Sequence, residues 1–441
     1  MAETVRYRRI AALAVPMALQ TATMLVGQVV VVALIGRMGD GAQYVQALYA
    51  PVEFLLIALV NGFAVSLQVT TARRVGAGAR ESVAGYYGGL LRLGLVSYAV
   101  LAAVLIMSAG ALGGLVDIAP EHADRFRAFL VAMVLVGPLR LGGELCSAVL
   151  RGVGRGVAAA LLTVTYVVST VVGVAVLGLG QGLGLTAVPV VAAVAGAVEL
   201  VAGLVLLGRT GLLTWRGVLR WPSDVPRLAL GVGLPVAASY VLLFVVNLLL
   251  VRIAAAGGPD AVAGFNAGYT VQTAVLVPAI GFGSAIAVLV NQGVGAGDRT
   301  VAATAFRRGV VLVAAGYAVV TVAFLLGGAP LASLMAGDPA VVEQARAFLT
   351  VVGPTFGCTG VVLAVLTVLQ QVGRGGLAVA LNLGYFALMV AVGWWAVDAS
   401  GSVGALHWTM AVIAVASVLV GLPVAAWSVR RAITPVGVRV A

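Results

Sequence analysis

Three glutamates lie inside long apolar runs of the sequence, at Glu53, Glu144 and Glu199. An ionisable side chain in the interior of a membrane is costly, so each of them is a candidate functional site. A carboxyl group in such a place can bind and release a proton or hold a cation. Glu199 is flanked by Gly196 and Ala197, which let a neighbouring helix approach closely. We therefore expect Glu199 to carry a coupling ion, the alternative being a glutamate that only hydrogen-bonds to another helix.

The other two glutamates differ in their surroundings. Glu53 follows Pro51 and lies about two turns inside its apolar run, so it is a second ion-coupling candidate. The alternative for Glu53 is an interfacial acid within reach of headgroups or water. Glu144 comes four residues after Arg140, which places both on one helical face and predicts an intrahelical ion pair. That pairing favours a structural role for Glu144.

Uncharged polar side chains inside the apolar runs are candidates for contact with a small molecule. The candidates are Gln28, Asn61, Tyr166, Asn247, Asn266, Tyr269 and Gln272. Any one of them could simply join two helices. As a group they exceed what a lipid-facing surface would carry. His122 and His407 fall near span ends and are expected in water at the outer face.

The composition requires a membrane. Hydrophobic residues make up 62% of the 441 residues, charged residues only 9%, and the mean hydropathy is +1.13. A soluble domain needs roughly 25% charged residues, and a spanning helix needs roughly 20 apolar ones. The sequence therefore predicts an all-α integral membrane protein of about twelve spans. The spans are expected near 10–35, 46–72, 84–112, 127–150, 157–180, 187–208, 228–255, 264–292, 303–328, 341–369, 376–397 and 404–428.

The arginines indicate orientation. The net charge is +11, but the basic residues lie between apolar runs rather than in one stripe, so we expect no nucleic-acid partner. The positive-inside rule places both termini in the cytoplasm of a bacterial cell whose cytoplasmic membrane holds the chain. Residues 210–226 alternate Trp215 and Trp221 with Arg216 and Arg220, which predicts an amphipathic interfacial linker on the cytoplasmic side. We expect a monomer in contact with membrane lipid.

The sequence repeats itself at an offset of 219 residues. Matching strings include Pro16 with Pro235, Gly62-Phe63 with Gly281-Phe282, and Val75-Gly76-Ala77-Gly78 with Val294-Gly295-Ala296-Gly297. Among polar positions, Gln28 matches Asn247 and Glu53 matches Gln272. The predicted organisation is an N-terminal six-helix lobe (1–209), the linker (210–226) and a C-terminal six-helix lobe (227–441).

Six spans per half make the repeat parallel, which is typical of secondary transporters that work by alternating access between two lobes. No phosphate-binding Gly-x-x-x-x-Gly-Lys string exists, so coupling to an ion gradient is expected, with a proton or sodium as the coupling ion and no other cofactor. No metal cluster or nucleophile string supports a membrane-embedded enzyme.

Several strings resemble the MATE family (multidrug and toxic compound extrusion). They are Gly36-Arg37-Met38-Gly39 at the end of the first run and Val290-Asn291-Gln292-Gly293-Val294-Gly295-Ala296-Gly297-Asp298 after the eighth. The resemblance implies an exporter that exchanges protons or sodium for amphipathic, often cationic, drugs or metabolites. Family members usually carry an Asp about five residues before the first string, where this chain has Val31. Acids are also absent from spans five and seven, so the coupling residues must differ here.

A second hypothesis keeps the architecture and changes the cargo to a lipid-linked saccharide or lipid, as in flippases of the same wider superfamily. Such proteins tend to line their cavity with basic residues for phosphate. Only Arg140 and Arg252 fall in or near spans, and both are expected towards the outer end. Their placement disfavours the flippase.

Overall fold

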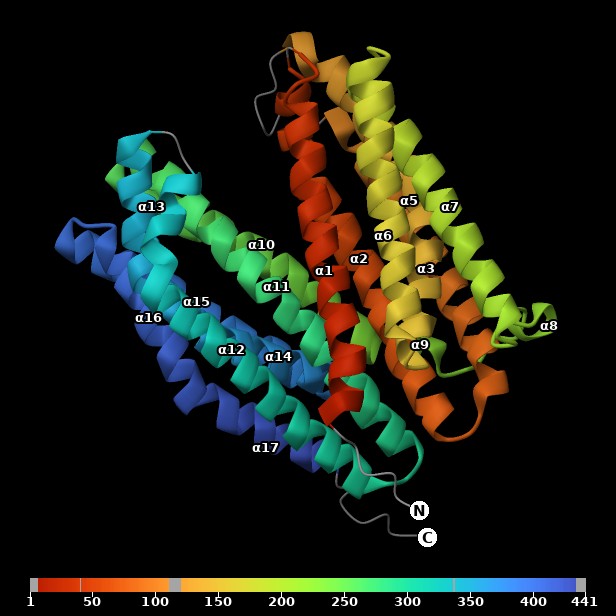
Figure 1. Cartoon of the computed structure of the whole chain (residues 1–441). Coiled ribbons are helices and arrows are strands. Elements are labelled where there is room, and N and C mark those ends of the chain that lie inside the picture. Colours follow the sequence, from red (N-terminus) through yellow and green to blue (C-terminus); the bar gives the residue numbers. More distant parts are fainter. Residues whose placement is uncertain (1–6, 40, 111–119, 336–337, 434–441) are drawn as a thin grey trace. The chain divides into compact units, whose positions relative to one another are not determined.

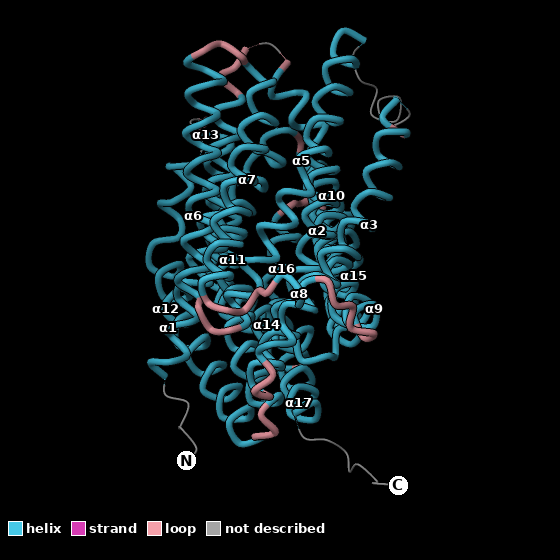
Figure 2. Tube along the Cα trace, turned by 90° about the vertical axis from the view of Figure 1, so that its right-hand side faces the viewer, coloured by secondary structure: helices cyan, strands magenta, loops and turns pink. Residues whose placement is uncertain are grey.

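The structure, a computed structural model, describes residues 7–39, 41–110, 120–335 and 338–433. Every regular element in these residues is a helix (Figure 1), and the remaining described residues form short connections (Figure 2). The helices up to the linker are α1 (Tyr7–Ile35), α2 (Ala42–Gly76), α3 (Val83–Met107), α5 (Pro120–Gly152), α6 (Gly156–Gly173), α7 (Ala187–Arg209), α8 (Trp215–Val218) and α9 (Val225–Leu228). Those that follow are α10 (Leu234–Ala254), α11 (Pro259–Gly295), α12 (Arg299–Met335), α13 (Pro339–Val351), α14 (Phe356–Leu369), α15 (Gly375–Ser400), α16 (Gly404–Leu419) and α17 (Gly421–Ile433).

The number of membrane spans agrees with the sequence. Among the described residues, 11 helical stretches are long and apolar enough to cross a membrane. One of them, Pro339–Ser400, has 62 residues. At 1.5 Å per residue it would extend about 93 Å, three times the hydrocarbon core, so it must cross twice. Its direction changes at Gly373, whose φ of 97° only glycine adopts readily. The all-α, multi-pass architecture with about twelve spans is thus confirmed.

The chain forms two compact units, and their boundaries follow the repeat. One unit is Leu19–Ala237, and the other joins Met1–Ala18 to Ala238–Ala441. The two cuts are equivalent, because 238 − 19 = 219. The start of α1 therefore belongs to the unit of the second repeat, and the start of α10 belongs to the unit of the first repeat. This composition differs from the lobes 1–209 and 227–441 expected from the sequence, since α1 and α10 are each divided.

A pair of glycines explains where the opening helices pack. A Cβ on Gly62 of α2 would lie 2.8 Å from the carbonyl oxygen of Gly233, within one unit. A Cβ on Gly281 of α11 would lie 2.7 Å from the carbonyl oxygen of Met17, within the other. These glycines are repeat equivalents, and each brings two helix backbones into direct contact.

Aromatic side chains fill the core of the unit that contains α11 to α17. Phe348 packs edge-on against Phe265, with ring centroids 5.5 Å apart, and against His407, 5.2 Å away. His407 is only 2% exposed, so the expectation of a solvated residue is wrong. The reason is that α16 turns this face towards α13 rather than outward.

We expect that replacing Gly281 by Ala lowers the thermal stability in detergent. The new methyl group would press on backbone atoms that cannot turn away, and such overpacking costs about 1–3 kcal/mol. Gly316→Ala is the matched control, because a Cβ there meets no atom within 4 Å. Equal melting temperatures for the two variants in a size-exclusion stability assay would contradict this packing.

Candidate functional site

Glu199 lies in the interface where α7 packs against α5. Small residues make the approach possible: a Cβ on Gly143 of α5 would lie 3.0 Å from the carboxyl carbon of Glu199. One turn further along α7, a Cβ on Gly203 would come within 2.6 Å of Cys146. Glu199 is completely buried as a result. The sequence-based expectation of close helix packing around Glu199 holds in the structure.

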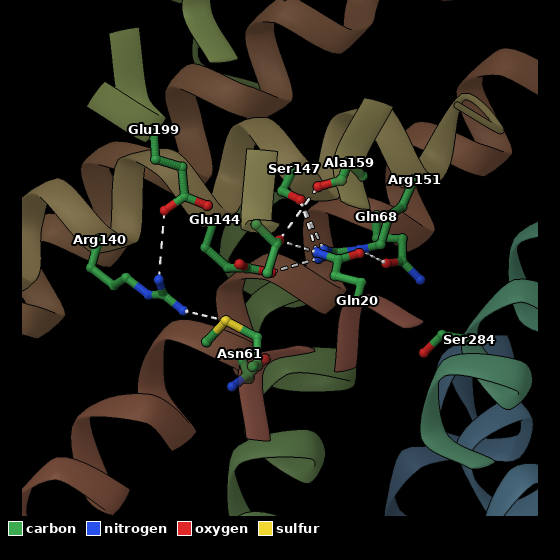
Figure 3. Close-up of polar contacts among 12 residues, drawn as sticks. Gln20, Asn61, Gln68, Arg140, Glu144, Ser147, Arg151, Ala159, Glu199 and Ser284 are labelled. Carbon is green, nitrogen blue, oxygen red and sulfur yellow. Dashed lines mark hydrogen bonds and ion pairs between the residues drawn. The ribbon is translucent and has the colours of Figure 1, made fainter. Parts of the chain in front are cut away.

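Arg140 of α5 faces this carboxyl group (Figure 3). Its Nη1 lies 3.6 Å from Oε2 of Glu199, close enough for an ion pair and too far for a strong hydrogen bond. Among the described residues, that Nη1 and both carboxyl oxygens of Glu199 have no hydrogen-bond partner. Burying a charged pair is favourable only when its remaining hydrogen-bonding capacity is satisfied. The pair is therefore held in place by packing while its polar atoms stay incompletely paired.

Arg140 also contacts the two helices on its other side. Its guanidinium carbon lies 3.9 Å from the ring centroid of Tyr166 on α6, and its Nη2 lies 3.4 Å from the sulfur of Met24 on α1. It interacts electrostatically with Glu53 on α2 as well. Two predicted site residues, Tyr166 and Glu53, are thus brought to the same arginine as Glu199.

Glu144 has a different partner from the one predicted. The expected pair with Arg140 is wrong, because Glu144 accepts a 2.8 Å hydrogen bond from Arg151, two turns further along the same face of α5. Arg151 also donates to Gln68 at 2.7 Å and to Ser147 at 3.1 Å. Each of the three nitrogens of Arg151 therefore donates a hydrogen bond, which the Arg140–Glu199 pair does not achieve.

A glutamine extends this network to α1. Gln20 donates to Ser147 of α5 at 3.2 Å and to Thr163 of α6 at 2.7 Å (Figure 3). This network was not predicted from the sequence. A signal did exist: Glu144, Ser147 and Arg151 follow one another at spacings of three and four, which puts them on one helical face.

The second repeat connects its opening helix to its fourth span without charged groups. Gln370 donates to Ser239 at 2.7 Å. These residues are the equivalents of Arg151 and Gln20, because 370 − 151 = 219 and 239 − 20 = 219. In both repeats the opening helix is therefore bound to the fourth span at equivalent positions. The first repeat uses a charged network, and the second uses a neutral hydrogen bond.

The remaining predicted residues are dispersed. Asn247 and Tyr269 form a hydrogen bond with each other, and Gln272 is buried with its Oε1 unpaired among the described atoms. Asn61 donates to the carbonyl of Ile57 in its own helix, which is a local role. Gln28 and Asn266 are exposed. Glu53 is half-buried and accepts a 3.3 Å hydrogen bond from Gln46.

The position of Arg140 also corrects an expectation. It does not lie at an outer helix end but inside α5, at the level of Glu199 in α7. The physical reason is that its pairing with Glu199 and the Tyr166 ring offsets the cost of burial. Arg252 is exposed and lies in the last turn of α10.

An apolar groove of about 510 Å³ lies between α1 and α6. It is lined by Leu19, Ala22, Thr23, Val26, Gly27, Val30, Val167, Val168, Val171 and Val172. Thr23 and Val167 adjoin Met24 and Tyr166, the two side chains that Arg140 touches. The groove can accept an apolar molecule, and the two helices that line it also carry the side chains that Arg140 touches.

Comparisons with known proteins agree with this architecture. The MatE family model matches residues 16–177 and again 235–395, with starts separated by 219 residues. No curated sequence matches significantly. Among solved structures, the Vibrio cholerae MATE transporter VcmN in its bent form is similar, with a TM-score of 0.88 and 17% identity over 97% of each chain.

Two further structures are alike in fold. A MATE transporter in the straight conformation has a TM-score of 0.89 and 18% identity, over 97% of this chain and 96% of that one. A MOP superfamily transporter from Pyrococcus furiosus, described as having a binding pocket of reverse polarity, has a TM-score of 0.87 and 16% identity over 97% of each chain. The fold is that of a multi-pass membrane transport protein. The chain belongs to the MatE family.

We expect Arg151→Gln alone and Glu144→Gln alone to destabilise the protein strongly. Removing one partner of a buried pair leaves an uncompensated charge, at about 3–5 kcal/mol. The double variant R151Q/E144Q makes the joint neutral, as at Gln370, and should recover part of that loss. Thermal unfolding in detergent measures this, with the exposed Arg80→Gln as control. Additive losses in the double variant would show that the pair is not coupled.

Proposed function

We propose that this protein is a proton-coupled exporter of amphipathic, often cationic, small molecules in a bacterial cytoplasmic membrane, with both termini in the cytoplasm. The observation that carries the proposal is the incompletely hydrogen-bonded pair of Glu199 and Arg140. The fold supports membrane transport, and the pair supplies an ionisable group at a position where protonation changes a contact.

Protonation of Glu199 removes the charge that attracts Arg140. The guanidinium is then free to move towards Tyr166 and Met24. Those contacts belong to α6 and α1, whose side chains line the apolar groove. Proton binding at Glu199 is thereby linked to the shape of the groove, which is what an exchange of proton for cargo requires.

A proton suits this site better than sodium. Hard metal cations need several oxygen ligands, and the oxygens of Glu199 have an arginine at 3.6 Å instead. A second cation at the same oxygen would be repelled by that guanidinium. Sodium coupling stays the alternative, with Glu53 as a further acid near Arg140.

The groove suits the apolar part of an amphipathic cargo, because all its lining side chains but Thr23 are apolar. A lipid-linked saccharide flippase would present free basic groups to phosphate. Arg140 is occupied by Glu199 and Tyr166, which disfavours that alternative.

Transport in proteoliposomes tests the coupling. With a fluorescent amphipathic cation such as ethidium as cargo, an imposed pH gradient should drive transport by the parent. Glu199→Gln should reduce it to the rate of protein-free liposomes, and Glu53→Gln should weaken it. Exposed Glu81→Gln should transport like the parent. If neither a pH nor a sodium gradient drives the parent, antiport is excluded; if the two carboxyl variants match the parent, these carboxyl groups carry no ion.

A double variant separates coupling from structure. Arg140→Gln should also abolish gradient-driven transport, because Glu199 then has no cation to release. In R140Q/E199Q the buried charges are both gone, so stability should return towards that of the parent while coupled transport stays absent. Recovery of coupled transport in R140Q/E199Q would show that the pair is only structural.

A further inference from the structure

The linker of residues 210–226 is fastened to the start of α3. Gly88 of α3 touches the carbonyl of Val218, and a Cβ on Gly217 would lie 2.7 Å from Cβ of Ala84. Arg92 donates to the carbonyls of Arg220 at 2.6 Å and Leu219 at 3.3 Å. These bonds fix the backbone that directly follows α8. The linker is therefore a fixed platform on its unit.

Large apolar side chains project from this platform. Trp215 is 81% exposed, Leu219 63% and Trp221 47%. Trp215 and Leu219 are four residues apart and follow one side of the helical turn. Arg92 packs over one face of the Trp221 ring, with its guanidinium carbon 5.2 Å from the ring centroid. The exposed parts of these three side chains are not covered by the described residues of this protein.

The same platform carries unpaired positive charge. Arg216 and Arg220 are exposed, and their guanidinium groups form no hydrogen bond or ion pair with any described residue. Asp224, the one acid in the linker, is already engaged: it lies 3.7 Å from Arg74 and accepts a hydrogen bond from Tyr86 at 3.0 Å. No acid of the linker is left to neutralise the two arginines.

We propose that the linker is a docking surface for anionic phospholipid. Arg216 and Arg220 bind the headgroup phosphate, while Trp215, Leu219 and Trp221 enter the boundary between headgroups and acyl chains. A soluble anion would need the guanidinium groups alone and would leave the exposed apolar side chains without a partner. The combination of charge and apolar surface selects a lipid, and the proposal does not depend on which ion drives transport.

Lipid retention measures this directly. The full-length protein is reconstituted in vesicles of phosphatidylcholine mixed with phosphatidylglycerol, extracted in detergent, and the bound lipid is counted by native mass spectrometry. The parent should retain phosphatidylglycerol preferentially. R216Q/R220Q should weaken that retention by on the order of thirty-fold at low salt, from about a factor of five per arginine. The charge-matched control R299Q/R307Q, at exposed arginines of the other unit, should retain it as the parent does.

Further outcomes decide against the proposal. Equal retention by R216Q/R220Q and the control would overturn it. A soluble-anion site would show as displacement of the lipid by glycerol 3-phosphate together with unchanged retention in W215A/L219A. The apolar variant is not expected to disturb folding, since both side chains are largely exposed. Loss of retention in W215A/L219A supports insertion into the lipid.

Discussion

Charged side chains inside an apolar medium must be paired, and the unit of residues 19–237 meets this constraint in two different ways. Arg151 and Glu144 are joined by a 2.8 Å hydrogen bond, and Arg151 has further acceptors on α2 and α5. Arg140 and Glu199 lie 3.6 Å apart with polar atoms unpaired. In the first arrangement every nitrogen of Arg151 donates a hydrogen bond, which stabilises the pair. The second has less hydrogen bonding to lose when the pair opens, which is the basis of the proposed proton coupling.

The internal repeat shows which part of this chemistry the fold requires. Gln370 and Ser239 make the joint of the second repeat with neutral groups, at the positions of Arg151 and Gln20. A charged network is therefore not needed to hold an opening helix against a fourth span. The repeat equivalents of Glu144 and Glu199 are Leu363 and Val418, so the second repeat has an apolar side chain at both positions. Ionisable chemistry has been concentrated in one of two similar folds.

The sequence was sufficient for architecture and insufficient for pairing. Spans, the repeat offset and the family resemblance follow from patterns that extend over the whole chain, such as the match of Gly62 to Gly281. The partner of Glu144 could not be predicted, because spacing along one helix allows both Arg140 and Arg151, and the choice depends on where α7 places Glu199. The burial of His407 depends in the same way on how α16 is turned. The division of α1 and α10 between units is likewise a tertiary property.

The proposed coupling requires Glu199 to take up and release a proton. Infrared difference spectroscopy of the reconstituted protein measures this directly, since a protonated carboxyl group has a carbonyl stretch that a carboxylate lacks. On lowering the pH, the parent and the exposed control Glu81→Gln should both show a band from a carboxylic acid shielded from water, and Glu199→Gln should lack it. Identical spectra from the parent and Glu199→Gln would contradict the account.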